Sequence, residues 1–200
     1  MGYAIVGFGA VGQALARAFA RKNIEVAVAS RRPPEALAPQ TREIGPTIVP
    51  RTLQDAIKAD TIILAVPFGE HREVAKALAS WQDKTIIDVT NAFGVPVEDL
   101  GGLPSSAVIA KAFPGAKLVK GFNHLAARLL AADPNTKHGH RVVFLSGDDE
   151  GATATVANLA GKLGYAPVSL GRIAEGGQLV GARGKSWGPL IFKDLFKKEQ

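Results

Sequence analysis

Cysteine is absent from this 200-residue chain, so disulfides, thiolate metal ligands and cysteine nucleophiles are excluded. No apolar run reaches the roughly 18 residues that a membrane-spanning helix needs. The first residues also lack the basic start and the small-residue cleavage site of a signal peptide. We therefore expect a cytoplasmic protein with no membrane partner.

Lysine and arginine are scattered along the chain rather than clustered. The net charge is +6, yet no run of Lys and Arg is longer than two, and aromatic residues make up only 6% of the chain. A nucleic-acid groove typically interleaves basic with aromatic side chains, so we expect no nucleic-acid partner. The positive charge fits either an anionic small molecule or an ordinary basic surface.

Short apolar runs alternate with stretches of helical periodicity. The strand-like runs are Tyr3–Val6, Glu25–Ala29, Thr47–Val49, Thr61–Val66, Thr85–Val89, Leu118–Val119, Arg141–Ser146 and Ala166–Leu170. The helix-like stretches are Val11–Phe19, Leu53–Lys58, Glu70–Trp81, Ser105–Phe113, Leu125–Ala132 and Ala152–Leu163. Strands that alternate with helices predict βαβ units, a parallel sheet and helices on both of its faces.

A glycine-rich loop follows the first predicted strand and opens the first helix: Gly7-Phe8-Gly9-Ala10-Val11-Gly12. In a dinucleotide-binding unit the first glycine allows the tight turn, the second lets the pyrophosphate approach the backbone, and the third lets the helix pack close to the sheet. The helix N-terminus then offers free N–H groups to the phosphates. Because a strand, this loop, a helix and a second strand follow in order, we predict that residues 7–12 bind a dinucleotide.

The end of the second predicted strand indicates which dinucleotide. An NAD site usually has an acidic residue there, which bonds the ribose 2′-hydroxyl. This chain instead has Ser30-Arg31-Arg32, and guanidinium groups suit a 2′-phosphate. We predict that the three residues select NADP(H); the alternative is an exposed arginine pair without that role. Pro33-Pro34 is expected to stop any helix and stiffen this loop.

Further candidates follow the central strands, where ligands of open α/β sheets lie. Val66, Pro67 and Phe68 are expected to border the path from adenosine to nicotinamide. Asn91 either bonds the nicotinamide ribose or the acceptor, or is a turn residue. His71 either faces the nicotinamide or lies exposed in a first helical turn, and we favour the exposed position.

No catalytic residue and no metal site can be assigned from the sequence. The chain has no GxSxG nucleophile elbow and no HExxH metal motif. His124 is the best placed histidine for an acceptor site, with a structural role equally open, and Asn123 is a candidate helix N-cap. His138 and His140 are expected to be exposed. A site without a general acid suits a flavin-like hydride acceptor, because the cofactor supplies the chemistry.

The chain resembles the NADPH-dependent reductases of coenzyme F420 over nearly its whole length. The motifs that carry the resemblance are Ile5–Gly12, Ser30–Arg32, Leu64–His71, Val119–Asn123 and Phe144–Asp149. The ferric-reductase domains of the STEAP proteins, which pass electrons to a flavin, look similar. The resemblance implies a Rossmann domain with a small C-terminal region, NADP on the glycine loop, 2′-phosphate contacts from Ser30, Arg31 and Arg32, and a flavin-like ring beside the nicotinamide. Acceptor contacts are then expected around Asp88–Val95, Glu175–Gly177 and Gly181–Gly188.

The expected fold class is therefore α/β, a doubly wound Rossmann-like parallel sheet with a small C-terminal α/β annex. Residues 1–122 are expected to form the NADP-binding domain and residues 123–200 the C-terminal region. The expected function is hydride transfer between NADPH and a small-molecule acceptor, either a deazaflavin of the F420 type or a flavin such as FMN or FAD. The alternatives are a non-catalytic NADPH sensor and an NADP-linked reductase of a small carbonyl or imine.

The end of the chain is expected to close the acceptor site. Glycines at 176, 177, 181, 184 and 188 predict a pliable lid or a close-packed turn. In Pro189–Phe196 the apolar residues Leu190, Ile191, Leu195 and Phe196 follow helical spacing. Such a face needs cover, either from the rest of the chain or from a second copy in a homodimer.

Overall fold

The computed structural model describes residues 2–96, 98–181 and 194–197. Its core is a parallel sheet built from β1 (Tyr3–Val6), β2 (Val26–Ala29), β3 (Ile48–Pro50), β4 (Thr61–Leu64), β5 (Thr85–Asp88) and β6 (Lys117–Gly121). These strands lie in the order β3-β2-β1-β4-β5-β6, and every neighbouring pair is parallel. This order is that of a doubly wound dinucleotide fold, so the predicted fold class is confirmed.

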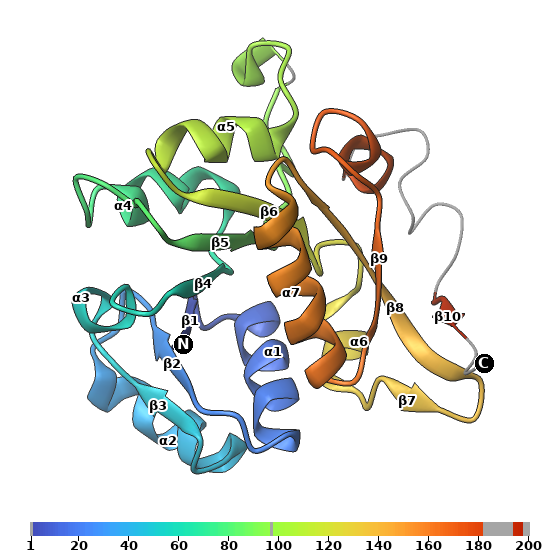
Figure 1. Cartoon of the computed structure of the whole chain (residues 1–200). Helices are drawn as coiled ribbons and strands as arrows, with labels where there is room; N and C mark the ends of the chain where they lie inside the picture. Colours follow the sequence, from blue (N-terminus) through green and yellow to red (C-terminus); the bar gives the residue numbers. More distant parts are fainter. Residues whose placement is uncertain (1, 97, 182–193, 198–200) are drawn as a thin grey trace.

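Helices cover both faces of this sheet (Figure 1). The α-helices are α1 (Ala10–Arg21), α2 (Pro34–Ile44), α3 (Leu53–Ala56), α4 (His71–Ala75), α5 (Ser105–Ala112), α6 (Ala127–Ala131) and α7 (Glu150–Lys162). Within the described residues, the short 3₁₀ helices are η1 (Phe68–Glu70), η2 (Glu98–Leu100) and η3 (Gly176–Val180).

Two buried hydrophobic clusters lie on opposite faces of the sheet. Ile5 belongs to one cluster together with residues of α1, α2, α6 and α7. Its strand neighbours Ala4 and Val6 belong to the other cluster with residues of α3, α4 and α5. Successive side chains of a strand point to opposite faces, so both faces of the central strands are buried, which explains their unbroken apolar runs.

Four later strands extend the same sheet: β7 (Asn135–Thr136), β8 (Gly139–Gly147), β9 (Ala166–Ser169) and β10 (Phe196–Lys197). The long strand β8 runs antiparallel to β6 and parallel to β9, beside the orange helix α7 in Figure 1. The buried guanidinium of Arg141 ties this region together, because its Nε lies 3.0 Å from both carboxylate oxygens of Asp194. The expected boundary between residues 122 and 123 stays a prediction.

Two helices differ from the sequence-based prediction. Helix α2 was missed, because Pro33-Pro34 was interpreted as a stop, whereas Pro34 is the first residue of the helix, where proline needs no N–H partner. The single helix predicted over Glu70–Trp81 is wrong, since only η1 and α4 form there. Trp81 is fully buried, with its ring 4.8 Å from that of Phe113, and its indole N–H donates to the Ala75 carbonyl. This packing of the indole takes the chain out of the helical path.

The C-terminal helix prediction is wrong where it can be tested. Phe196 belongs to strand β10 and pairs with Arg141 of β8, while Leu190 and Ile191 lie outside the described residues. Gly176 lies in a close-packed turn, while Gly184 and Gly188 lie outside the described residues and the lid stays a prediction. A Cβ on Gly176 would lie only 1.7 Å from the Leu170 carbonyl oxygen, so no larger residue fits there.

Candidate functional site

The three glycines of the loop between β1 and α1 meet three different environments. Gly7 has a positive φ of 103°, and a Cβ there would lie 2.3 Å from the carbonyl oxygen of Ala65. A Cβ on Gly12 would lie 2.0 Å from the carbonyl oxygen of Gly7, so the helix approaches the loop as closely as predicted. Gly9, the N-cap of α1, has no atom within 4 Å of such a Cβ. Gly7 and Gly12 are therefore needed by the fold, and Gly9 keeps space open.

The open side of the loop faces a cavity of about 570 Å³. Three chain segments that end parallel strands line it, after β1, β2 and β4. The sequence-predicted residues among its lining are Gly7, Phe8, Gly9, Ser30, Arg31, Arg32, Val66 and Pro67. The fold thus brings together the predicted pyrophosphate loop and the predicted phosphate-selecting residues, at the carboxyl edge where such sheets bind ligands.

The segment after β2 carries two arginines with different partners. The Ser30 hydroxyl accepts a hydrogen bond from the backbone N–H of Arg32 at 3.0 Å, which shapes the turn. The Arg32 guanidinium donates to the neutral side chain of Gln40. The Arg31 guanidinium lies 3.3 Å from the Glu70 carboxylate, which also lines the cavity. Sequence reasoning missed Glu70, because it lies 39 positions further along the chain than Arg31.

Other predicted residues lie outside this cavity lining. Ala10 and Val11 belong to the first turn of α1. Phe68 is buried, and its carbonyl oxygen pairs with Nδ1 of His71. The favoured exposed position of His71 is wrong, because only 2% of this residue is exposed. Its ring packs against that of Phe68, with the two centroids 5.0 Å apart, and its role stays open.

Asn91 and Asn123 form a second polar group, after strands β5 and β6. The Asn91 amide donates to the backbone carbonyl of Asn123, and the Asn123 amide donates to the side-chain oxygen of Asn91 at 3.1 Å. The Asn123 amide also donates to the carbonyl of Val180 in η3. The N-cap predicted for Asn123 is wrong, since α6 starts after Ala126. The asparagine pair instead joins two strand ends to the C-terminal region.

A buried ion pair between Asp88 and Lys120 supports the segment that contains Asn91. Asp88 and Lys120 are register partners on β5 and β6, their side chains are 0% and 3% exposed, and Nζ lies 3.1 Å from the carboxylate. Asp88 also accepts hydrogen bonds from Ser106 and from the Thr90 backbone N–H, while Lys120 donates to the Thr90 carbonyl. The sequence analysis missed this pair, although a charged residue near the end of each of two apolar strands could have indicated it.

The remaining histidines lie outside the lining of the cavity beside the glycine loop. Burial lowers the pKa of His124 to about 4, so its ring is neutral and packs on Phe144. His138 is exposed as predicted, but His140 is half-buried and its Nδ1 lies 3.0 Å from the Gly164 carbonyl oxygen. Across residues 2–96, 98–181 and 194–197, no group of three or more His, Asp or Glu residues could hold a metal ion.

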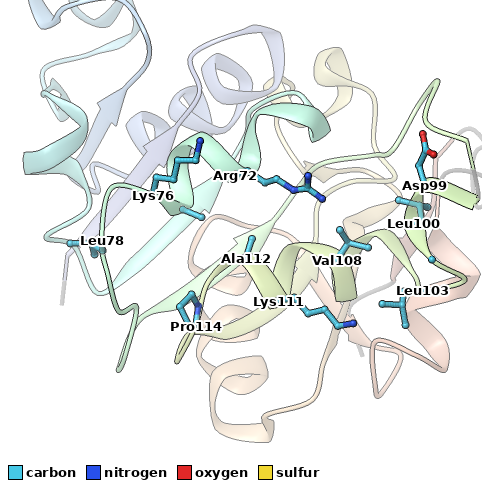
Figure 2. A pocket seen from close by; sticks show the side chains of 12 residues that line it. Arg72, Lys76, Leu78, Asp99, Leu100, Leu103, Val108, Lys111, Ala112 and Pro114 are labelled. Carbon is cyan, nitrogen blue, oxygen red and sulfur yellow. The ribbon is translucent and has the colours of Figure 1, made fainter.

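A second hollow of about 650 Å³ lies between α4, η2 and α5. Figure 2 shows Arg72 and Lys76 at the α4 side and Val108, Lys111 and Ala112 on α5. None of the predicted cofactor residues lines it. The cavity beside the glycine loop is therefore the candidate site.

No helix in the described part of the chain is long and apolar enough to cross a membrane.

The strand order and the glycine loop define an α/β protein of the Rossmann-like dinucleotide-binding class. Residues 2–92 match the family model of coenzyme F420-dependent NADP oxidoreductases. This N-terminal part of the chain is therefore similar to that family.

Known proteins extend the likeness beyond the matched segment. The metalloreductase STEAP3 of Rattus norvegicus is 30% identical over 174 residues, which cover 86% of this chain. The chain spans about one third of that relative, 34% of its length. A hypothetical protein from Sinorhizobium meliloti has a TM-score of 0.91 and 37% identity, with 99% of this chain and 96% of that chain covered.

Two further solved structures differ in how much of their own length is matched. A protein from Arthrobacter sp. FB24, provisionally described as an F420-dependent NADP-reductase, has a TM-score of 0.72 and 26% identity, with 100% of this chain and 99% of that chain covered. An imine reductase from Aspergillus terreus, solved in complex with NADPH4 and dibenz[c,e]azepine, has a TM-score of 0.66 and 22% identity. The match covers 87% of this chain but only 56% of the imine reductase. At 22% identity, this likeness shows only that the two proteins share a fold.

Proposed function

We propose that the protein is an NADP(H)-dependent oxidoreductase that transfers hydride between NADPH and a flavin-like or deazaflavin acceptor. The observation that carries this proposal is the cavity in which Gly9 faces Ser30, Arg31 and Arg32. The loop leaves room for a pyrophosphate beside the N-terminus of α1, and the guanidinium groups suit a 2′-phosphate. The residues present therefore fit NADP(H).

The polar groups after β5 and β6 support a hydride acceptor that needs no protein acid. NADPH supplies the hydride when bound. The asparagine pair can orient a nicotinamide ribose or a ring by hydrogen bonds. Lys120 is engaged by Asp88 and Thr90, and His124 is neutral because its pKa is about 4. These side chains favour positioning over proton transfer, which suits a flavin or F420 ring.

Cofactor choice is tested by calorimetry with NADPH and NADH. Charge-assisted bonds to phosphate contribute about 1.5–3 kcal/mol each, so we expect at least a roughly tenfold preference for NADPH. Replacing Arg31 and Arg32 together with alanine should remove the preference and leave NADH binding nearly unchanged. Equal dissociation constants for the two nucleotides in the unmodified protein would contradict the proposal.

The acceptor is tested by turnover. NADPH oxidation is measured with F420, FMN, FAD and cyclic imines as separate acceptors, and we expect turnover with a flavin or deazaflavin. Turnover with imines alone would favour the carbonyl or imine reductase. Tight NADPH binding without turnover of any acceptor would favour the sensor. The homodimer stays a prediction, which light scattering tests.

A further inference from the structure

We infer that Glu70 is a specificity-determining residue that reduces the preference of this site for NADP(H) over NAD(H). The inference rests on the proposed function, because it concerns the same cavity. Glu70 is the last residue of η1, which follows strand β4. Strands β2 and β4 flank β1 on opposite sides, so Glu70 approaches the predicted 2′-phosphate site from the side opposite to β2. Its carboxylate lies 3.3 Å from Arg31, and its side chain is 33% exposed.

The pairing gives the two arginines unequal roles. Arg31 already has an anionic partner, whereas Arg32 donates to the neutral oxygen of Gln40. A 2′-phosphate carries a charge between about −1.5 and −2. To bind Arg31, the phosphate must therefore displace the Glu70 carboxylate from it. This competition weakens NADP(H) binding, whereas NAD(H), which lacks the phosphate, binds without this cost.

Glu70 also supplies the kind of side chain, a carboxylate, that an NAD site has at the end of its second strand and that this chain lacks there. A carboxylate at the adenosine ribose of an NAD site accepts a hydrogen bond from the 2′-hydroxyl. In this cavity the carboxylate comes from the β4 side instead. Glu73 lines the same cavity but pairs with Lys76 at 2.7 Å, and its side chain is 73% exposed. Glu70 is therefore the carboxylate that is engaged with the predicted phosphate-binding side chains.

The test measures dissociation constants for NADPH and NADH by calorimetry with the full chain. Glu70→Gln removes the charge but keeps the size and the polar end of the side chain. We expect NADPH to bind about fivefold more tightly, with NADH binding unchanged or weaker. In an Arg31→Ala background the same substitution should change NADPH binding less than about twofold, because the shared partner is gone.

Two controls separate this pairing from a general effect of net charge. Glu43→Gln removes a carboxylate that also pairs with an arginine, Arg17 at 3.8 Å, but lies outside the cavity lining. It should change neither constant more than about twofold. The gain from Glu70→Gln should shrink at about 0.5 M NaCl, where screening acts over a few ångströms. Circular dichroism melts confirm that each variant is folded.

The outcomes are distinguishable. An increased NADPH preference in Glu70→Gln that disappears in the Arg31→Ala background supports the inference. Tight NADPH binding with an unchanged or lower preference overturns the inference and leaves the proposed function standing. If the unmodified protein binds neither nucleotide, the proposed function fails and the inference fails with it.

Discussion

Gly9 and Gly12 belong to one sequence motif, yet their substitution should have opposite effects. A Cβ on Gly9 meets nothing within 4 Å, and its φ of −82° is open to any residue. A Cβ on Gly12 would lie 2.0 Å from the Gly7 carbonyl oxygen, which is backbone and cannot rotate away. We therefore predict that Gly9→Ala removes cofactor binding but keeps the fold, and that Gly12→Ala damages the fold itself.

The magnitudes follow from these surroundings. At a helix N-cap, alanine costs about 1 kcal/mol relative to better capping residues, so Gly9→Ala should remain folded at room temperature. Backbone overlap at Gly12 requires α1 to shift from the sheet, and overpacking of this kind costs about 3 kcal/mol or more. A methyl group at Gly9 occupies the space of the pyrophosphate, so we expect NADPH affinity to fall about a hundredfold or more.

Urea denaturation measures the free energy of unfolding of both variants, and calorimetry with NADPH measures binding by those that fold. The expected pattern is a stable Gly9→Ala protein that does not bind and a destabilised Gly12→Ala protein. Tight NADPH binding by a well-folded Gly9→Ala protein would refute the reasoning and place the cofactor elsewhere. A Gly12→Ala protein as stable as the unmodified one would show that the helix can move at little cost.

Two further predictions concern buried ionisable groups. The pKa of His124 in the folded protein is about 4, below its ordinary value of 6.5. The contribution of the neutral ring to the free energy of unfolding is therefore complete above about pH 6.5 and is lost as the pH falls toward 4. Between about pH 7.5 and 5, the free energy of unfolding should fall by about 2 kcal/mol because of this group. Urea melts should show this loss reduced in His124→Phe, and an equal loss in that variant would contradict the prediction. Lys120→Met leaves the Asp88 carboxylate buried and unpaired, so it should cost about 3–5 kcal/mol. Adding Asp88→Asn should restore part of it in thermal melts, and a cost below about 1 kcal/mol for Lys120→Met alone would count against the ion pair.

The parallel sheet was predictable because its signals are local and repeated. Strands β1, β2, β4 and β5 coincide with short apolar runs, and the loop glycines have the spacing that one turn and one close helix approach require. The extent of α4 was not predictable in the same way. Helical periodicity runs through Trp81, but the chain leaves the helix because the indole packs against Phe113, which is distant in sequence.

The candidate site was predictable only in its half nearest the N-terminus. Ser30, Arg31 and Arg32 can be predicted as a phosphate site from their residue types and their position after a strand. Glu70 cannot be predicted in this way, because its effect depends on its position beside Arg31, which only the strand order produces. The pairing of Asp88 with Lys120 likewise depends on the register between β5 and β6.

The predicted phosphate-selecting region and the Asn91 region are held by different forces. The predicted phosphate-selecting region depends on exposed side chains, since 86% of the Arg31 side chain is accessible to solvent. Such interactions are weak, screened by salt and easily exchanged, so changes there should alter cofactor preference without altering stability. The Asn91 region rests on a buried ion pair that holds the backbone of Thr90 by two hydrogen bonds. The hydride transfer that we propose would need reacting atoms placed within a fraction of an ångström, and a rigid support at this end, with an adaptable cofactor end, would meet that requirement.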